Sequence, residues 1–271
     1  MSVLPPFALH RPSTITEALE ALSFDDMPLG GGTELLLAMR MRMLRPDSLV
    51  NIKNIPELHT LEIDGDHLVI GGAVTHQTAA EHPLVVDQLP ILRRVLLEVG
   101  NPRIRASGTL AGNLIFAEPK SDVIPILLAL DATVTLVSSR GPRNMTIDEL
   151  ILGPYYAARE PDELLSEIRI PLGRVLRAVY LKYQTMERPT VGVAALDHDS
   201  DGDVVRRVVI GAATELPVRH DFSPGEPIEG KSIAETMEIV PDIAGSERYK
   251  RHVVAIYVDR ALAALDREER A

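Results

Sequence analysis

The sequence predicts an α+β protein of two compact units, and three observations support this prediction. At 271 residues the chain is longer than most single domains and can bury a sizeable core. Segments that alternate as strands do are interleaved with segments of helical periodicity. Near Gly173 a new series of strands begins. We therefore expect a mixed α+β unit over residues 1–173, subdivided near residue 55, and a smaller sheet-and-helix unit over residues 174–271.

In the first unit, short apolar or alternating segments predict the strands, and capped or amphipathic segments predict the helices. The helix expected near residue 18 follows Thr14 and Glu17, which have the spacing of a capping box. Asp64 and Gly65 predict a hairpin between two of the strands. The expected strands cover residues 27–29, 48–52, 61–63, 67–70, 132–137 and 164–170. The expected helices cover residues 18–22, 35–39, 75–81, 84–99 and 123–130.

The second unit is expected to contain three strands followed by two helices. The strands cover residues 178–183, 191–196 and 204–212, and a turn at Asp201 and Gly202 joins the last two. The helices cover residues 232–240 and 246–265. Apolar residues of the last helix recur on one face, which is more typical of a helix packed on a core than of an interface.

The composition excludes several classes of protein. A net charge of −11 and a pI near 5.2 leave no basic stripe for nucleic acid. Because the chain has no cysteine, it forms no disulfides, thiolate metal sites or cysteine-held iron–sulfur clusters. Redox chemistry would have to come from a bound organic cofactor or a partner chain. The sequence shows neither a secretory signal nor a window of roughly 20 apolar residues, so we expect a cytoplasmic protein without a transmembrane segment.

Two glycine-bearing turns are the strongest functional signal. The first is the Gly-Gly-Gly-Thr-Glu segment at residues 30–34, and the second is the Ser-Gly-Thr-Leu-Ala-Gly-Asn segment at residues 107–113. Glycine lets backbone N–H groups approach a phosphate closely, and the positive end of a helix dipole favours an anion there. Thr33 and Thr109 add hydroxyl donors. A single turn of this kind is weak evidence, because glycine-rich turns also occur for purely steric reasons. The two turns together favour a binding site for a pyrophosphate.

Other candidate sites have plainer explanations. Residues 225–232 match the spacing of a P-loop, but a proline and two glutamates within the segment argue against a phosphate site. The eight histidines show no pair at a spacing of three or four, and we expect His76 and His82 to lie on helix surfaces rather than to bind a metal. Taken alone, Asp122 would most simply cap the helix that follows it. Lys182 would most simply face solvent on an edge strand.

The second turn and its surroundings resemble the FAD-binding subunits of molybdenum hydroxylases. The resemblance rests on residues 101–114, residues 119–122 and the apolar segment at 125–132. The first turn, at residues 30–34, matches the family's other signature in order and spacing. The family includes the medium subunit of carbon monoxide dehydrogenase and the flavin domain of xanthine dehydrogenase, and the likeness extends over nearly the whole chain.

This resemblance implies a vanillyl-alcohol-oxidase-type (PCMH-type) FAD-binding domain followed by a small α+β C-terminal domain of the carbon monoxide dehydrogenase type. It implies that both glycine turns hold the FAD pyrophosphate and that Asp122 contacts ribityl or ribose hydroxyls. Lys182 is expected near the flavin ring, where a cation stabilises the anionic reduced flavin, and Leu165 at the ring through its backbone. The implied cofactor-binding residues are Leu29, Gly30, Gly31, Gly32, Thr33, Glu34, Ser107, Gly108, Thr109, Ala111, Gly112, Asn113, Asp122, Leu165 and Lys182. No catalytic residue and no metal ligand is implied.

By the same resemblance, the chain is the FAD-carrying electron-transfer subunit of a multi-subunit molybdenum hydroxylase. A large partner would hold molybdopterin and oxidise the substrate, and a small partner would carry two [2Fe–2S] clusters. The flavin would pass electrons to NAD⁺, a quinone or another acceptor. The expected assembly is a dimer of heterotrimers. Some relatives shield the flavin with an aromatic residue where this chain has Arg188, Pro189 and Thr190. The sequence therefore does not identify the electron acceptor. The alternatives are a stand-alone flavin-binding accessory or assembly protein, and a flavin-free scaffold.

Overall fold

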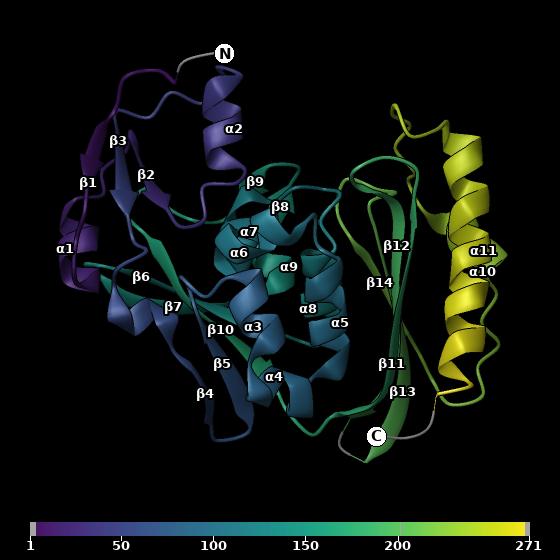
Figure 1. Cartoon of the computed structure of the whole chain (residues 1–271). Coiled ribbons are helices and arrows are strands. Elements are labelled where there is room, and N and C mark those ends of the chain that lie inside the picture. Colours follow the sequence, from purple (N-terminus) through teal and green to yellow (C-terminus); the bar gives the residue numbers. More distant parts are fainter. Residues whose placement is uncertain (1–3, 201, 269–271) are drawn as a thin grey trace.

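In the computed structural model, which describes residues 4–200 and 202–268, the chain begins with a small parallel sheet. Its strands are β1 (Ala8–His10), β2 (Asp26–Leu29) and β3 (Ser48–Asn51), in the order β1-β3-β2. The helices α1 (Ile15–Glu20) and α2 (Leu35–Arg40) form the crossovers between them. The sheet lies at one end of the molecule, at the left of Figure 1. The first glycine turn comes directly after β2.

A five-stranded antiparallel sheet forms the centre of the first unit. Its order is β4-β5-β10-β6-β7, so the late strand β10 lies in the middle. The strands are β4 (Leu61–Asp64), β5 (His67–Gly71), β6 (Thr133–Ser138), β7 (Gly141–Thr146) and β10 (Leu164–Pro171). A two-stranded hairpin, β8 (Ile151–Gly153) and β9 (Tyr156–Ala157), precedes β10.

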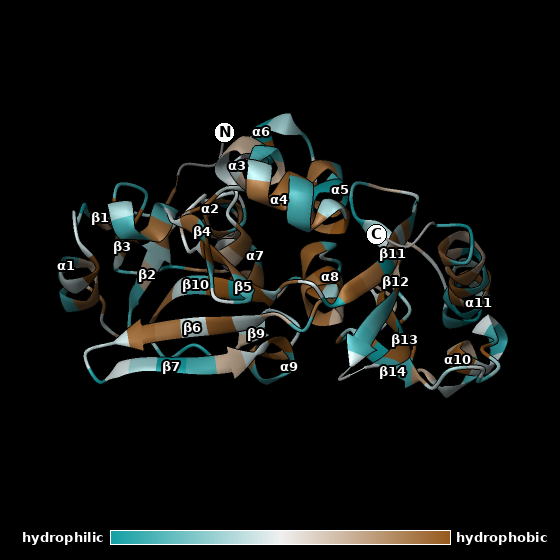
Figure 2. Ribbon diagram, turned by 90° about the horizontal axis from the view of Figure 1, so that it is seen from below, coloured by the Kyte–Doolittle hydropathy of each residue, from teal (hydrophilic) through white to brown (hydrophobic). Residues whose placement is uncertain are grey.

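Short helices cover one face of this central sheet (Figure 2). Buried apolar residues of the sheet and of most of these helices form one core. The helix at Pro56–His59 packs in a separate cluster, and the helix at Pro102–Ser107 buries no residue. Each of these helices is too short to be stable without tertiary packing. The helices are η1 (Pro56–His59, a 3₁₀ helix), α3 (His76–Glu81), α4 (Pro83–Gln88), α5 (Pro90–Glu98), α6 (Pro102–Ser107), α7 (Leu110–Phe116), α8 (Val123–Ala129) and α9 (Ile147–Leu150).

The C-terminal part is an antiparallel sheet between two helical layers (Figure 1). Its strands, in the order of the chain, are β11 (Val175–Gln184), β12 (Pro189–Ser200), β13 (Asp203–Gly211) and β14 (Val218–Phe222). One face joins the core of the first unit through residues such as Tyr180. The other face packs on α10 (Gly230–Thr236) and α11 (Glu247–Leu265). Within the described ranges, no helix is both long enough and apolar enough to cross a membrane.

Most strands and helices lie where the sequence predicts them, but the single helix expected over residues 84–99 is wrong. The structure has two helices there, α4 and α5, separated at Leu89, whose φ of −137° and ψ of 60° are not helical. Pro90 explains the break, because proline has no backbone N–H and disfavours the helical conformation in the residue before it. In the predicted turn between β12 and β13, Asp201 lies outside the described residues.

The Asp242 carboxylate connects a buried lysine of α11 with a lysine of the first unit. The side chain of Lys250 on α11 is 1% exposed, and its Nζ donates to the Val240 carbonyl oxygen at 2.8 Å and lies 2.8 Å from Asp242 Oδ2. Lys120, between α7 and α8, approaches the same oxygen at 2.6 Å. Partial burial raises the pKa of Asp242, but the hydrogen bonds from Lys120 and Lys250 outweigh burial and hold the pKa at about 2.

Asp242→Asn should lower the free energy of unfolding at neutral pH, because it leaves the buried Lys250 ammonium without its counter-charge. The pKa of Asp242 is about 2 in the fold and about 3.8 in the unfolded chain. The carboxylate therefore stabilises the fold above about pH 4, and this stabilisation is lost as the pH falls toward 2. Urea unfolding measures this effect: the difference in the free energy of unfolding between wild type and Asp242→Asn should become smaller below about pH 4.

The matched control is Asp87→Asn, which removes an exposed carboxylate from α4 and should change stability little at any pH. The free energies of unfolding of wild type and Asp242→Asn could instead differ by the same amount at neutral and acidic pH. That result would contradict the stabilising role of this carboxylate.

Candidate functional site

A cavity of about 730 Å³ opens beside the two glycine turns. Pockets for cofactors typically measure roughly 300–1,000 Å³. The predicted site residues that line the cavity are Gly30, Gly31, Gly32, Thr33, Glu34, Thr109, Ala111, Gly112, Asn113, Asp122 and Leu165. The other predicted residues, Leu29, Ser107, Gly108 and Lys182, are not part of the lining. The structure thus brings residues of both turns to one cavity.

The first glycine turn depends on glycine for two different reasons. Gly32 has a φ of +73°, which glycine adopts without strain. Gly31 packs so closely on the second turn that a Cβ would lie 2.2 Å from the Ser107 carbonyl oxygen. Among residues 4–200 and 202–268, no group accepts a hydrogen bond from the backbone N–H of Gly31, Gly32 or Thr33. These donors are therefore available to a ligand in the cavity.

The second glycine segment consists of two helix ends rather than one turn. α6 ends at Ser107, α7 begins at Leu110, and Gly108 and Thr109 connect them. Thr109 caps α7, since its Oγ1 accepts a hydrogen bond from the Gly112 N–H at 3.0 Å. The backbone N–H of Ala111 finds no acceptor in the described part of the chain. Backbone donors from the two segments therefore converge on one cavity, as anion sites at helix starts require.

Asp122 lines the cavity and is held by two residues of β11. Its Oδ1 accepts a hydrogen bond from the Tyr180 hydroxyl at 2.6 Å, and its Oδ2 lies 3.2 Å from Lys182 Nζ. The plainer expectation, that Asp122 caps α8, is wrong because its side chain makes no capping hydrogen bond. Ser121 performs that role, since its Oγ accepts from the first two N–H groups of α8 at 3.0 and 3.3 Å.

Lys182 lies on an edge strand, as expected, but it does not face solvent. Its side chain is 15% exposed, and Nζ donates to the carbonyl oxygen of Glu98, at the end of α5, at 2.9 Å. The solvent-facing alternative is therefore wrong. Lys182 is not part of the lining, but it pairs with Asp122, which is.

Comparisons with known proteins agree with this geometry. A family model described as "FAD binding domain in molybdopterin dehydrogenase" matches residues 5–173. The chain belongs to this family. It is 29% identical to the nicotine 6-hydroxylase medium subunit of Paenarthrobacter nicotinovorans, over 96% of this chain and 97% of that protein. It is 28% identical to the carbon monoxide dehydrogenase medium chain of Hydrogenophaga pseudoflava, over 97% of this chain and 98% of that protein. Quinoline 2-oxidoreductase from Pseudomonas putida 86 has the same fold, with a TM-score of 0.89 at 26% identity over 97% of this chain and 98% of that chain.

Membership of this family confirms the α+β FAD-binding fold and FAD as the cofactor. The relatives are named subunits of hydroxylases and dehydrogenases, so this FAD-binding chain is an oxidoreductase subunit. The cavity fits the cofactor, because its unpaired backbone donors suit the negatively charged pyrophosphate and its volume lies in the range of cofactor pockets.

His76 is a residue of this cavity that sequence reasoning missed. It was expected on a helix surface, but it is 3% exposed and lines the cavity. Its Nδ1 has no hydrogen-bond partner in the described part of the protein. Burial, followed by the charge of Arg105, lowers the pKa of His76 to about 4, so the ring is neutral near pH 7. No sequence pattern predicts this burial, because the six residues of α3 are too few for periodicity to identify a buried face.

Arg188 connects the second unit with the first glycine turn. Its guanidinium lies 2.8 Å from Glu34 Oε1 and 3.1 Å from Glu118 Oε2. Arg188 and Pro189 line the FAD cavity, whereas Thr190 is fully buried in β12. The arginine thus balances the charge of the Glu34 carboxylate in the first glycine turn, and the sequence alone assigned no role to this segment.

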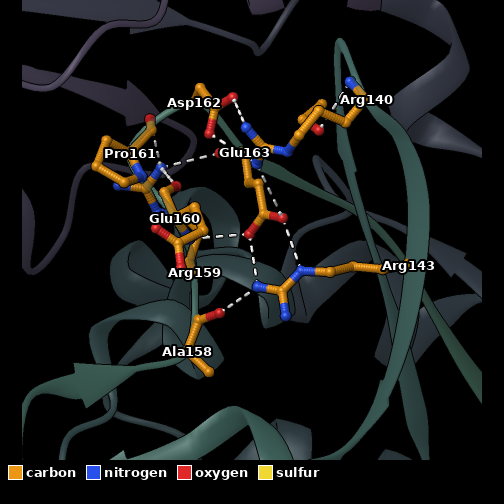
Figure 3. A network of polar contacts seen from close by, with 9 residues as sticks. Arg140, Arg143, Ala158, Arg159, Glu160, Pro161, Asp162 and Glu163 are labelled. Atoms are coloured by element: carbon orange, nitrogen blue, oxygen red, sulfur yellow. Dashed lines mark hydrogen bonds and ion pairs between the residues drawn. The ribbon is translucent and has the colours of Figure 1, made fainter.

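A network of arginines and carboxylates fixes the segment that precedes β10 (Figure 3). Arg143 on β7 donates to both carboxylate oxygens of Glu163 at 2.6 and 2.7 Å. Burial raises the pKa of Glu163, but the hydrogen bond from Arg143 contributes to a net lowering. Arg159, which lines the cavity, donates to three backbone carbonyl groups of residues 160–163. The network therefore holds the wall of the cavity where the chain approaches Leu165.

Proposed function

We propose that this chain is the electron-transfer subunit of a multi-subunit molybdenum hydroxylase. Electrons enter its FAD from [2Fe–2S] clusters on a small partner and leave to NAD⁺, a quinone or another acceptor. The observation that carries the proposal is the match to medium subunits over 97% and 98% of their length, with a cavity suited to FAD. Because the sequence has no cysteine, cysteine-held clusters belong to a different chain.

In this proposal the two glycine turns, at residues 30–34 and 107–113, hold the FAD pyrophosphate through backbone N–H groups. Asp122 accepts hydrogen bonds from ribityl or ribose hydroxyls, and the backbone of Leu165 borders the flavin ring. Lys182 contributes a positive charge near the ring from its ion pair with Asp122. Bound FAD supplies the electron-carrying ring, and the protein supplies binding and electrostatics.

The proposed domain division places the FAD-binding domain at residues 1–173 and the C-terminal domain at residues 174–271. The proposed partners are a large molybdopterin subunit and a small iron–sulfur subunit, assembled as a dimer of heterotrimers. Support comes from the names of two relatives, the carbon monoxide dehydrogenase medium chain of Hydrogenophaga pseudoflava and the 6-hydroxypseudooxynicotine dehydrogenase complex subunit alpha of Paenarthrobacter nicotinovorans.

Purification of the tagged chain from its native host tests the proposal. We expect two further chains to co-elute, with molybdenum, iron and FAD in a constant ratio across the peak. Recovery of the chain with FAD but without metal-bearing partners would favour the stand-alone accessory protein instead. Recovery of the assembled complex without FAD would contradict the assignment of the cavity.

A further inference from the structure

Tyr180 is a buried residue beside the FAD cavity that the proposed function does not yet use. Its side chain is 1% exposed, and its hydroxyl donates to Asp122 Oδ1 at 2.6 Å. Burial, followed by the charge of Asp122, raises the pKa of Tyr180 well above its usual value. The phenol therefore keeps its proton and remains a hydrogen-bond donor to this carboxylate.

The neighbouring strands leave room for this contact. A Cβ at Gly192 on β12 would lie 2.4 Å from the Tyr180 hydroxyl oxygen. Gly211 on β13 pairs directly with Gly192, and a Cβ there would lie 2.4 Å from Pro125 Cγ on α8. Two adjacent glycines thus let the beginning of α8, with Asp122, approach the sheet closely. The glycine at 192 specifically admits the hydroxyl that reaches the carboxylate.

Both oxygens of Asp122 are held from one strand. Tyr180 and Lys182 are two residues apart on β11, so their side chains leave the same face of the sheet. Each contacts a different oxygen of the carboxylate. An ionised carboxylate accepts about four hydrogen bonds, and these two contacts leave about two acceptor positions. A carboxylate fixed in this way offers its remaining acceptors to the cavity in one orientation.

We propose that Tyr180 is a positioning residue for the FAD site, which holds the Asp122 carboxylate so that it accepts hydrogen bonds from cofactor hydroxyls. This inference rests on the proposed contact between Asp122 and FAD. It adds that the contact depends on a hydroxyl group from the second unit and on the absence of a side chain at Gly192.

A double-mutant cycle on FAD affinity tests the inference, with FAD titrated into the apoprotein. Tyr180→Phe should raise the Kd about tenfold, the loss expected for a hydrogen bond to a charged group. Asp122→Asn should raise it at least as much, and Tyr180→Phe should then add less than about twofold in the Asp122→Asn background. Tyr183→Phe is the matched control, because this hydroxyl on the same strand contacts Tyr249 and should leave the Kd unchanged.

Gly192→Ala provides a reciprocal test, because its methyl group displaces the Tyr180 hydroxyl. It should weaken FAD binding in the wild type and have little further effect in Tyr180→Phe. If Asp122→Asn weakens binding while Tyr180→Phe does not, or if their effects simply add, the positioning role of Tyr180 is wrong. If Asp122→Asn itself leaves the Kd unchanged, the proposed contact between Asp122 and FAD is wrong.

Discussion

Gly30→Asp should raise the Kd for FAD by at least about 100-fold, because it places a carboxylate beside the pyrophosphate, and like charges in contact cost several kcal/mol. Gly30 lines the cavity, and a Cβ there would lie 3.2 Å from Thr109 Oγ1, on the second turn. The new charge therefore lies between the two glycine segments. Arg188 does not offset it, because its guanidinium already pairs with Glu34 and Glu118.

Two control variants separate charge from steric effects. Gly30→Ala adds the same Cβ without the charge, and a shift of a few tenths of an ångström relieves its contact with Thr109, so most of the FAD affinity should remain. Gly153→Asp adds a carboxylate on β8, where a Cβ meets only the Cβ of Tyr156, at 3.9 Å. It should bind FAD as the wild type does. Equal losses for Gly30→Ala and Gly30→Asp would show that the position tolerates no side chain and would contradict the electrostatic explanation.

Arg207→Met should lower the free energy of unfolding by about 2 kcal/mol, because it removes the charge-assisted hydrogen bonds of a buried guanidinium to two partly exposed aspartates while keeping most of the side-chain volume. Arg207 is 2% exposed on β13. Its guanidinium pairs with Asp131 and Asp221, both at 2.7 Å, and donates to the Ala129 carbonyl oxygen at 2.8 Å. These contacts join the C-terminal sheet to the end of α8, so their loss also weakens the packing between these two elements.

Urea unfolding monitored by circular dichroism measures this effect. Arg248→Met is the matched control, because Arg248 is exposed on α11 and the substitution should change stability by less than about 0.5 kcal/mol. The loss of stability for Arg207→Lys should fall between these two values, since one ammonium group cannot replace a planar guanidinium that contacts two aspartates, a carbonyl oxygen and His198. A loss below about 1 kcal/mol for Arg207→Met would mean that Arg219, which pairs with the same two aspartates, is sufficient alone.

Local rules made much of this fold predictable from the sequence. Glycine marked both segments that border the cavity because its freedom at positive φ and its lack of a Cβ are properties of the residue itself, as Gly31 and Gly32 illustrate. The α+β class, the family and the FAD cofactor are confirmed. The break at Pro90 obeys a local rule as well, and the error there came from following apolar periodicity across a proline.

The remaining features depend on contacts between distant segments, which no local pattern encodes. Arg188 reaches Glu34 across 154 positions of the chain, and Tyr180 reaches Asp122 across 58. The burial of His76 likewise depends on packing against Gly108 rather than on its own helix. The individual cofactor contacts of the site residues stay predictions until the FAD variants are measured.

If Asp122 binds FAD as we propose, the position of β11 links FAD binding to the packing of the C-terminal sheet on the rest of the chain. Asp122 belongs to the first unit, but both residues that hold its side chain, Tyr180 and Lys182, belong to the sheet. By reciprocity, FAD that binds more tightly to the docked form favours docking by the same factor. If Asp122 binds FAD as we propose, the bound cofactor would therefore strengthen the packing between the two parts of the chain.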